Sequence, residues 1–350
     1  AALLVTAGMS QIALAGDSVY VNTSSLRYRT SAQIKDNNIA GNLSYGQKLE
    51  RVGTSGQWTM ILLNGKKYYV SSAYVTSKKP ASAGAVQTTS QTAAGAQTSG
   101  GTAIALSSNY KYANYSKINS GTATLYRSTA SNKKNKVVCV NAGHGTNGGG
   151  SVKTQCHPDG SAKVTGGTTG AGATSAVAVS SGMSFADGTA ESKVTLAMAK
   201  VLKTKLLNAG YDVLMIRESD DVQLDNIART VIANNNADCH IALHWDSTSS
   251  NKGAFFMSVP SNATYRAMEP VASHWKQHNQ LGESLISGLK SAGVKIYSKG
   301  SMEMDLTQTS YSTIPSVDIE LGDKASDHSG ATLETLANGL LTGVNTFFGQ

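Results

Sequence analysis

The 350-residue sequence has no long hydrophobic run, only three cysteines and few acidic residues in its first part. No stretch approaches the roughly 18 to 20 apolar residues that cross a bilayer, so the sequence predicts no membrane span. Residues 1–136 hold fifteen Lys and Arg against three acidic residues, a balance of +12. Fifteen against nineteen leaves −4 for residues 137–350. A basic first half on a near-neutral second half indicates an anionic polymer as partner.

The three cysteines are an odd number, and a chain of this size does not need a disulfide framework to fold. Cys139 and Cys239 lie in strand-like stretches, where a thiol is a small core side chain. Cys156 stands beside His157, a pairing that suggests a nucleophile and its base. Neighbours in sequence generally point apart, whereas a Cys/His hydrolase brings the two groups together from separate elements. The sequence therefore favours a structural Cys156, with catalysis as the alternative.

Residues 1–16 resemble the second half of a secretory signal. They are apolar and then small, and Ala13-Leu14-Ala15 fits an A-x-A cleavage site. We interpret this segment as a signal remnant and expect a secreted protein; a merely apolar tail is the alternative. Export argues against nucleic acid as the anionic partner of the basic first half.

Residues 17–78 alternate short β-type runs with turns, which is typical of a small all-β barrel. Asn64-Gly65 predicts a two-residue hairpin between the run 58–63 and the run 68–70. Trp58, Tyr69 and Tyr74 either line a binding groove or fill the core of so small a barrel.

The motifs of this segment resemble the bacterial SH3 domains of cell-wall enzymes. In order they are Leu26-Arg27-Tyr28-Arg29, Ser44-Tyr45-Gly46-Gln47-Lys48, Gly56-Gln57-Trp58, and Gly65 followed by Tyr69 through Val75. Thr30-Ser31 departs from that family's usual first turn. The resemblance implies an SH3-like wall-binding domain over residues 17–78.

Residues 79–136 are predicted to be a flexible basic linker. Their first part, 80–106, is Ala, Ser, Thr, Gly and Gln with almost no bulky side chains, so it buries too little apolar surface to offset the entropy of ordering. Residues 107–136 add tyrosines and six basic residues without an acid. We interpret this second part as extended and wall-adhesive.

From residue 137 onward, strand patterns alternate with helix patterns. Their order predicts an α/β catalytic domain over 137–350 with a doubly wound, mainly parallel sheet. A Gly-, Ser-, Thr- and Ala-rich insertion at 145–188 interrupts the order. The expected strands are 137–141, 212–216, 239–244, 294–297 and 316–321, and the expected helices are 189–208, about 224–232, 278–292 and 329–347.

Three residues with metal-binding side chains fall at the ends of these elements. His144 follows the first strand, Glu191 lies on the first turn of a helix, and His244 ends a strand. Strand ends and helix starts converge above an open α/β sheet. Two histidines and one glutamate leave a fourth position open, which is the make-up of a catalytic zinc site. Each residue has a plainer alternative: a hydrogen-bonded loop histidine, a first-turn glutamate complementing the helix dipole, and a core histidine.

A fourth residue supplies the acid/base that zinc hydrolysis needs. Glu320 ends the strand Ser316 to Leu321, so its carboxylate is suited to take a proton from water and pass it to a leaving amine. Asp318 shares its strand face and competes for the role, but its position two residues earlier is expected to place it deeper in the sheet.

These motifs together resemble the zinc-dependent N-acetylmuramoyl-L-alanine amidases over about 210 residues. They are Asn141-Ala142-Gly143-His144-Gly145, Glu191, Arg229, Ile241 through Ser247, and Pro315 through Gly322. The resemblance implies that His144, Glu191 and His244 bind Zn²⁺ and that Glu320 is the catalytic acid/base. The substrate would be the amide between muramic acid and L-Ala in peptidoglycan, and the protein would be cell-wall associated through residues 17–136.

Two departures from this family and two alternative functions stay open at this stage. Asp323-Lys324-Ala325 replaces an aromatic and aliphatic pair, and the insertion 145–188 is long. Glycines within the insertion disfavour a helix that plugs the zinc, so we expect activity without an activator. The alternatives are a zinc peptidase of stem or cross-bridge peptides and a non-catalytic wall-adhesion protein.

Overall fold

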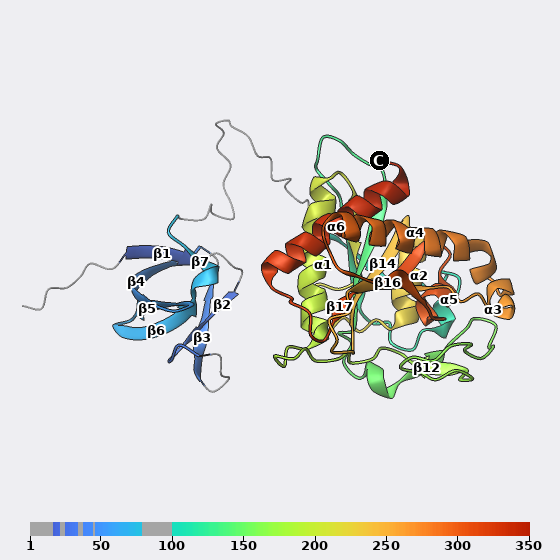
Figure 1. Cartoon of the computed structure of the whole chain (residues 1–350), viewed down its shortest axis with the longest axis horizontal. Coiled ribbons are helices and arrows are strands. Elements are labelled where there is room, and N and C mark those ends of the chain that lie inside the picture. The colour runs from blue at the N-terminus through green and yellow to red at the C-terminus, as the bar shows by residue number, and fades with distance from the viewer. Residues whose placement is uncertain (1–16, 22–24, 34–37, 45, 79–99) are drawn as a thin grey trace, which may run out of the picture. The chain divides into compact units, whose positions relative to one another are not determined.

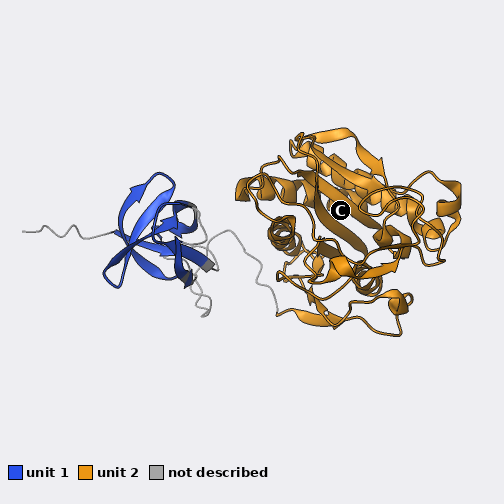
Figure 2. Ribbon diagram, turned by 90° about the horizontal axis from the view of Figure 1, so that it is seen from below, with its two compact units in different colours: residues 1–92 blue, residues 93–350 orange. Residues whose placement is uncertain are grey.

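The computed structural model describes residues 17–21, 25–33, 38–44, 46–78 and 100–350. The chain divides into two compact units, residues 1–92 and 93–350 (Figures 1 and 2). The proposed signal remnant at 1–16 and the first part of the expected linker, 79–99, lie outside the described residues. In the part of the chain that is described, no helix is long and apolar enough to cross a membrane.

The first unit is an all-β sheet in which every recorded strand pair is antiparallel. Its order is β3-β2-β6-β5-β4-β1-β7. Val19, Leu49, Ile61 and Val70 are among the aliphatic residues of its small core. The strands are β1 (Asp17–Val21), β2 (Ser25–Arg29), β3 (Ile39–Ser44), β4 (Lys48–Ser55), β5 (Trp58–Leu63), β6 (Lys66–Ser71) and β7 (Val75–Thr76).

The hairpin predicted at Asn64-Gly65 is confirmed. Strands β5 and β6 pair antiparallel up to Leu63 and Lys66, which leaves a two-residue turn. Asn64 has φ 50° and Gly65 has φ 73°. Positive φ at both turn positions matches the twist of the flanking strands, and Asn-Gly adopts it with little strain.

The second unit is built on an eight-stranded mixed sheet with the order β16-β15-β17-β14-β10-β13-β9-β8. Its centre, β13-β10-β14-β17, is parallel. Strand β15 pairs antiparallel with β17, and β9 pairs antiparallel with β13 and β8. Strand β16 pairs parallel with β15 at the other edge, so the sheet is mixed, with parallel pairs at its centre and at the β15–β16 edge. The strands are β8 (Thr102–Ala105), β9 (Thr122–Tyr126), β10 (Val137–Ala142), β13 (Asp212–Met215), β14 (Cys239–Asp246), β15 (Ala254–Ser258), β16 (Ile296–Glu303) and β17 (Ser316–Asp323).

The linker expected at 79–136 is wrong for residues 100–136. Strands β8 and β9 extend the sheet beyond β13, with Ala123 and Leu125 buried against the core. Tyr112 and Tyr115 pack on Tyr311 at ring distances of 5.5 Å, so these tyrosines are packing residues rather than adhesive ones. The composition of residues 100–136 did not predict an ordered structure, but their contacts with the rest of the second unit order them.

The new boundary also redistributes the charge. Nine Lys and Arg against three acids give the first unit +6, and twenty-one against nineteen give the second unit +2.

Helices cover both faces of the second sheet, as a doubly wound order requires. The main core joins α1, α4 and α6 to one face, through residues such as Met198, Leu285 and Leu340. Helix α2 packs on the other face, through Ala228 and Ile232. The helices are α1 (Glu191–Asn208), α2 (Asn226–Asn236), α3 (Ala263–Ala267), α4 (Val271–Ser291), α5 (Thr307–Tyr311) and α6 (Gly330–Phe348).

The insertion 145–188 contains no α-helix. It holds a 3-10 turn at Gly149–Ser151 and a short antiparallel pair, β11 (Lys153–Gln155) with β12 (Ser175–Val177). This agrees with the expectation that its glycines disfavour a blocking helix.

Candidate metal centre and active site

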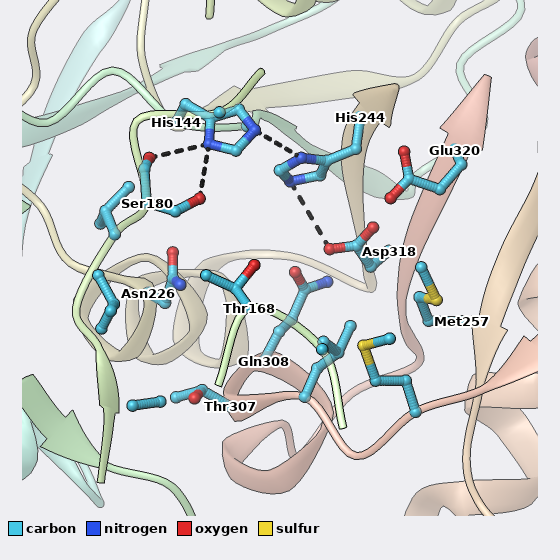
Figure 3. A pocket seen from close by; sticks show the side chains of 18 of the residues that line it. His144, Thr168, Ser180, Asn226, His244, Met257, Thr307, Gln308, Asp318 and Glu320 are labelled. Carbon is cyan, nitrogen blue, oxygen red and sulfur yellow. Dashed lines mark hydrogen bonds and ion pairs between the residues drawn. The ribbon is translucent and has the colours of Figure 1, made fainter. Parts of the chain in front are cut away.

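The candidate site lies at the carboxyl ends of the central parallel strands. His144 follows β10, His244 lies near the end of β14, and Glu320 lies near the end of β17, in register with His244. Glu191 is the first residue of α1. Figure 3 shows His144, His244 and Glu320 around one cavity. The residues predicted from four separate motifs therefore meet at one edge of the sheet.

The ligand atoms of His144, Glu191 and His244 form a nearly equilateral triangle. His144 Nε2 lies 2.9 Å from Glu191 Oε1, and His244 Nδ1 lies 3.0 Å from His144 Nε2 and 3.2 Å from Glu191 Oε1. A tetrahedral zinc ion with bonds of about 2.0–2.1 Å needs ligand atoms about 3.3 Å apart. The three atoms therefore fit one face of such an ion, and they form a group that can hold a metal.

The hydrogen bond at Nδ1 of the His144 ring, on the side away from Glu191, determines whether Nε2, on the side facing Glu191, carries a proton or a lone pair. Nδ1 lies 2.9 Å from the carbonyl oxygen of Ser180, which can only accept, so Nδ1 carries a proton. Nε2 of a neutral ring then presents a lone pair to the Glu191 carboxylate, which has no proton to offer. A cation between the two atoms removes the repulsion, so the donor set fits a metal ion.

Backbone amides fix the Glu191 carboxylate. Trp245 N donates to Oε1 at 3.0 Å, and Met183 N donates to Oε2 at 2.9 Å. Burial opposes ionisation, but the interactions with His144 and His244 outweigh it and hold the pKa of Glu191 well below its usual range. The carboxyl group is therefore ionised and ready to bind a cation.

The end of the insertion lies directly against the ligands. Ser180 bonds His144, and Met183 bonds Glu191. Between them, Gly182 has φ +81°, and a Cβ there would lie 2.8 Å from both Glu191 Oε2 and His144 Cδ2. The insertion is thus part of the wall that orients the candidate metal ligands.

Two buried arginines hold the loop that carries His144. The loop is strained, because His144 has φ 63°. Arg217 donates to the carbonyl oxygens of Ala142 and Gly143 at 3.1 and 2.9 Å. Arg229 donates to the carbonyl oxygens of Ala142 and His144 at 3.2 and 2.7 Å. These hydrogen bonds hold the backbone of His144 in the left-handed conformation that places its imidazole ring.

Asp318 and Glu320 on β17 both face the cavity (Figure 3). Asp318 Oδ2 lies 3.6 Å from His244 Nε2, on the outer side of that ring. Burial would lower the pKa of His244, but Asp318 and Glu191 raise it to about 10. The sequence position of Asp318 had suggested that it lies deeper in the sheet. Its carboxyl group instead reaches the cavity, where it is in place to orient His244.

The Glu320 side chain has a buried oxygen, Oε2, without a hydrogen-bond partner. Asp318 Oδ1 is also buried and without a partner. Burial raises the pKa of both carboxyl groups, and the charge of Asp318 raises that of Glu320 further. An unsatisfied buried carboxyl of this kind is uncommon unless it has a ligand or a chemical role.

Cys156 does not have the surroundings of a nucleophile. Its side chain is buried, and burial raises the pKa of its thiol. Both ring nitrogens of His157 are already bonded, Nδ1 with Ser161 Oγ at 2.9 Å and Nε2 with Asp305 Oδ2 at 3.1 Å. Cys156 is therefore a core residue, as the sequence favoured.

Comparison with protein families identifies the fold and the reaction. The family model described as N-acetylmuramoyl-L-alanine amidase matches residues 138–340, which is more than half of the chain. The chain belongs to this family. The amidase hydrolyses the bond between N-acetylmuramic acid and L-Ala in peptidoglycan. This function replaces the two alternatives considered for the catalytic unit, a zinc peptidase and a non-catalytic wall-adhesion protein.

One solved structure with a TM-score above 0.5 supports the fold of this amidase, and two matches with lower TM-scores are also found. The N-acetylmuramyl-L-alanine amidase of Mycobacterium smegmatis has 18% identity and a TM-score of 0.51, covering 63% of this chain and 99% of that chain. The apo form of the amidase of Mycobacterium abscessus has 20% identity and a TM-score of 0.45, covering 61% and 98%. The amidase of Clostridium difficile 630 has 18% identity and a TM-score of 0.44, covering 61% and 97%. A comparison with curated protein sequences finds no match.

Proposed function

We propose that His144, Glu191 and His244 hold a zinc ion in this amidase and that Glu320 is its acid/base. The observation that carries the proposal is the triangle of ligand atoms with the unpartnered Glu320 Oε2 beside it. Two imidazoles and a carboxylate with an open fourth position suit catalytic zinc. When bound, zinc would lower the pKa of water to about 7 and polarise the scissile carbonyl group.

Glu320 carries a proton from one half of the reaction to the other. Its carboxylate accepts a proton from the attacking water as the water oxygen bonds to the lactyl carbonyl carbon. The protonated carboxyl then donates to the L-Ala nitrogen, so the carbon–nitrogen bond breaks and a neutral amine leaves. Because burial raises the pKa of Glu320, the group can hold the proton between the two steps.

Asp318 and Ser180 act as positioning residues for the two histidines. Asp318 faces His244 Nε2, and the carbonyl oxygen of Ser180 accepts from His144 Nδ1. Partners on the outer ring nitrogen fix the tautomer and increase the basicity of the inner nitrogen.

Digestion of purified peptidoglycan tests the metal and the bond together. Enzyme stripped with a chelator should release at least about a hundredfold less stem peptide than the same enzyme after zinc is restored. Mass spectrometry should find peptides that begin with a free L-Ala. Stem peptides clipped elsewhere and still attached to muramic acid would contradict the proposal, as would full activity after the metal is removed.

We also propose that residues 17–78 are an SH3-like wall-binding domain and that residues 1–16 belong to an export signal. Seven antiparallel strands with an Asn-Gly hairpin support the first assignment, and the apolar stretch with its A-x-A site supports the second. The charge of +6 on residues 1–92 suits anionic wall polymers. A secreted, wall-associated enzyme is consistent with a peptidoglycan substrate.

A further inference from the structure

The cavity beside the candidate metal centre has a volume of about 560 Å³ and a second wall that the reaction does not use. Thr168 of the insertion, Asn226 of α2, and Thr307 and Gln308 of α5 lie across it from His144 and His244 (Figure 3). All four side chains are neutral and polar. This wall is available to contact the part of the substrate that lies beyond the scissile bond.

Gln308 is a fixed hydrogen-bond acceptor in this wall. Its Nε2 donates to Ser316 Oγ at 2.9 Å and to the carbonyl oxygen of Val317 at 3.0 Å. The carbonyl oxygen of Val317 cannot donate a hydrogen bond, so the Gln308 amide group cannot be flipped to place its oxygen there. Its Oε1 is therefore the atom that faces the cavity (Figure 3). The side chain is buried and already ordered, so binding a donor to Oε1 costs little entropy.

The two cationic side chains that line the cavity, apart from its histidines, are committed elsewhere. Lys163 donates to the carbonyl oxygen and to Oδ1 of Asp305. All five N–H groups of Arg229 are used. Their acceptors are Leu224 O, Asn141 Oδ1, Ala142 O, His144 O and Thr146 Oγ1.

The acceptors in the cavity, in contrast, are in excess. Asp318 Oδ1 and Glu320 Oε2 have no partner, and Gln308 Oε1 adds a third oxygen. An anionic group placed against Gln308 would meet these oxygen atoms at short range, and the Lys163 and Arg229 side chains that line the cavity already have acceptors of their own.

We propose that this wall selects substrates that offer N–H donors, and specifically stem peptides in which the α-carboxyl group of the second residue is amidated. The inference rests on the amidase function. At about 3.3–3.6 Å per residue, the second residue lies about 7 Å along the chain from the scissile amide, a reach that a cavity of this size can hold. A site built to bond an N–H group rejects an analogue that lacks it, because its own polar atoms are left unpaired.

A competition digest with the zinc-loaded full-length enzyme tests the proposal. The substrate is an equimolar mixture of two soluble peptidoglycan preparations that differ only in whether that α-carboxyl group is –CONH₂ or –COO⁻. Mass spectrometry of the released stem peptides gives the ratio of kcat/KM. We expect the amidated peptide to be released at least about tenfold faster, the effect of one hydrogen bond of about 1.4 kcal/mol.

Placing a cation on the wall should reverse part of this preference. Thr168 is exposed and lines the cavity, so Thr168→Lys should raise kcat/KM for the acidic peptide several-fold, while Thr168→Gln, of similar reach and no charge, should not. Gln308→Met should slow release of the amidated peptide alone. If Gln308→Met does not fold, the comparison of Thr168→Lys with Thr168→Gln tests the selectivity instead.

Equal release of both peptides by the unmodified enzyme, or faster release of the acidic one, would overturn the selectivity and leave the amidase function intact. Release of neither peptide would instead overturn the function on which the selectivity rests.

Discussion

At the scale of single residues, the metal centre depends on space as much as on ligands. A Cβ at Gly143 would overlap the His244 ring, so no larger residue fits between the β10 loop and that ligand. We predict that Gly143→Ala displaces His244 and lowers metal affinity by about 10- to 100-fold, the effect seen when a ligand loses its support. Titration with zinc in the presence of a competing chelator measures this affinity.

Gly150→Ala is the matched control for that substitution. Gly150 is exposed, lies seven residues beyond Gly143 and has no atom within 4 Å of an added Cβ. Its zinc affinity should equal that of the unmodified enzyme. Unchanged affinity in Gly143→Ala would show that His244 does not need its present position.

The places of the candidate ligands and of Glu320 could be predicted from the sequence, whereas the residues that support them could not. His144, His244 and Glu320 follow apolar strand runs, and the ends of parallel strands meet at one edge. Ser180 and Met183 come from a Gly- and Ser-rich insertion with no local motif, and two of their contacts are made by backbone atoms. Only Asp318 had a signal, because it shares a strand face with Glu320.

At the scale of elements, the insertion is anchored by one buried carboxylate. Asp305 lies after β16 and accepts from Lys163 Nζ at 3.0 Å, Val164 N at 2.7 Å and Thr165 N at 3.0 Å, all in the insertion, and from His157. Burial alone would raise the pKa of Asp305, but these hydrogen bonds and the charge of Lys163 outweigh it and lower that pKa.

We predict that Asp305→Asn lowers the free energy of unfolding by about 3 kcal/mol at pH 7, because it leaves Lys163 buried without its counter-charge. A carboxyl group whose pKa is depressed on folding stabilises fully above its unfolded pKa of about 3.9, and the stabilisation is lost as the pH falls through the folded value. The stability gap between wild type and Asp305→Asn should therefore narrow below about pH 4.

Urea denaturation at pH 7, 5 and 3 measures that gap. Asp220→Asn is the control, since Asp220 is exposed and the change should stay within about 0.5 kcal/mol. A gap that stays constant from pH 7 to pH 3 would show that the charge of Asp305 does not anchor the insertion.

Elements with strong periodicity were predictable, and short or edge elements were not. Helices α1, α2 and α6 and strands β10, β14 and β17 lie close to their predicted positions. Strand β15 was missed because it is a short, fully buried apolar run without alternation. Helix α4 begins at Val271 rather than at the predicted 278, and its N-cap residue, Pro270, makes no side-chain cap that would mark this start in the sequence.

At the scale of the whole molecule, most of the positive charge lies in the first unit and the candidate site lies in the second. The first unit carries +6, whereas the second carries +2 and all four proposed site residues. If the first unit holds anionic wall polymer, binding to intact sacculi should weaken with salt, since the Debye length shortens from about 10 Å at 0.1 M to about 3 Å at 1 M.

We predict that removing residues 1–92 slows lysis of sacculi several-fold and leaves turnover of a small soluble muramoyl-peptide nearly unchanged. Sedimentation with sacculi at low and high salt compares the full chain with the second unit. Equal binding by the two proteins would remove the targeting role from the first unit.

The central claim is that His144, Glu191 and His244 hold the metal while Glu320 moves the proton. It is tested most directly by measuring bound zinc and peptidoglycan turnover in Glu320→Gln and His144→Ala side by side. Glu320→Gln should keep its zinc and fold and lose about 10²- to 10⁴-fold in kcat, the value of general acid/base catalysis, whereas His144→Ala should lose zinc and activity together. A Glu320→Gln enzyme that releases its zinc, while the fraction still loaded turns over at the normal rate, would contradict the assignment.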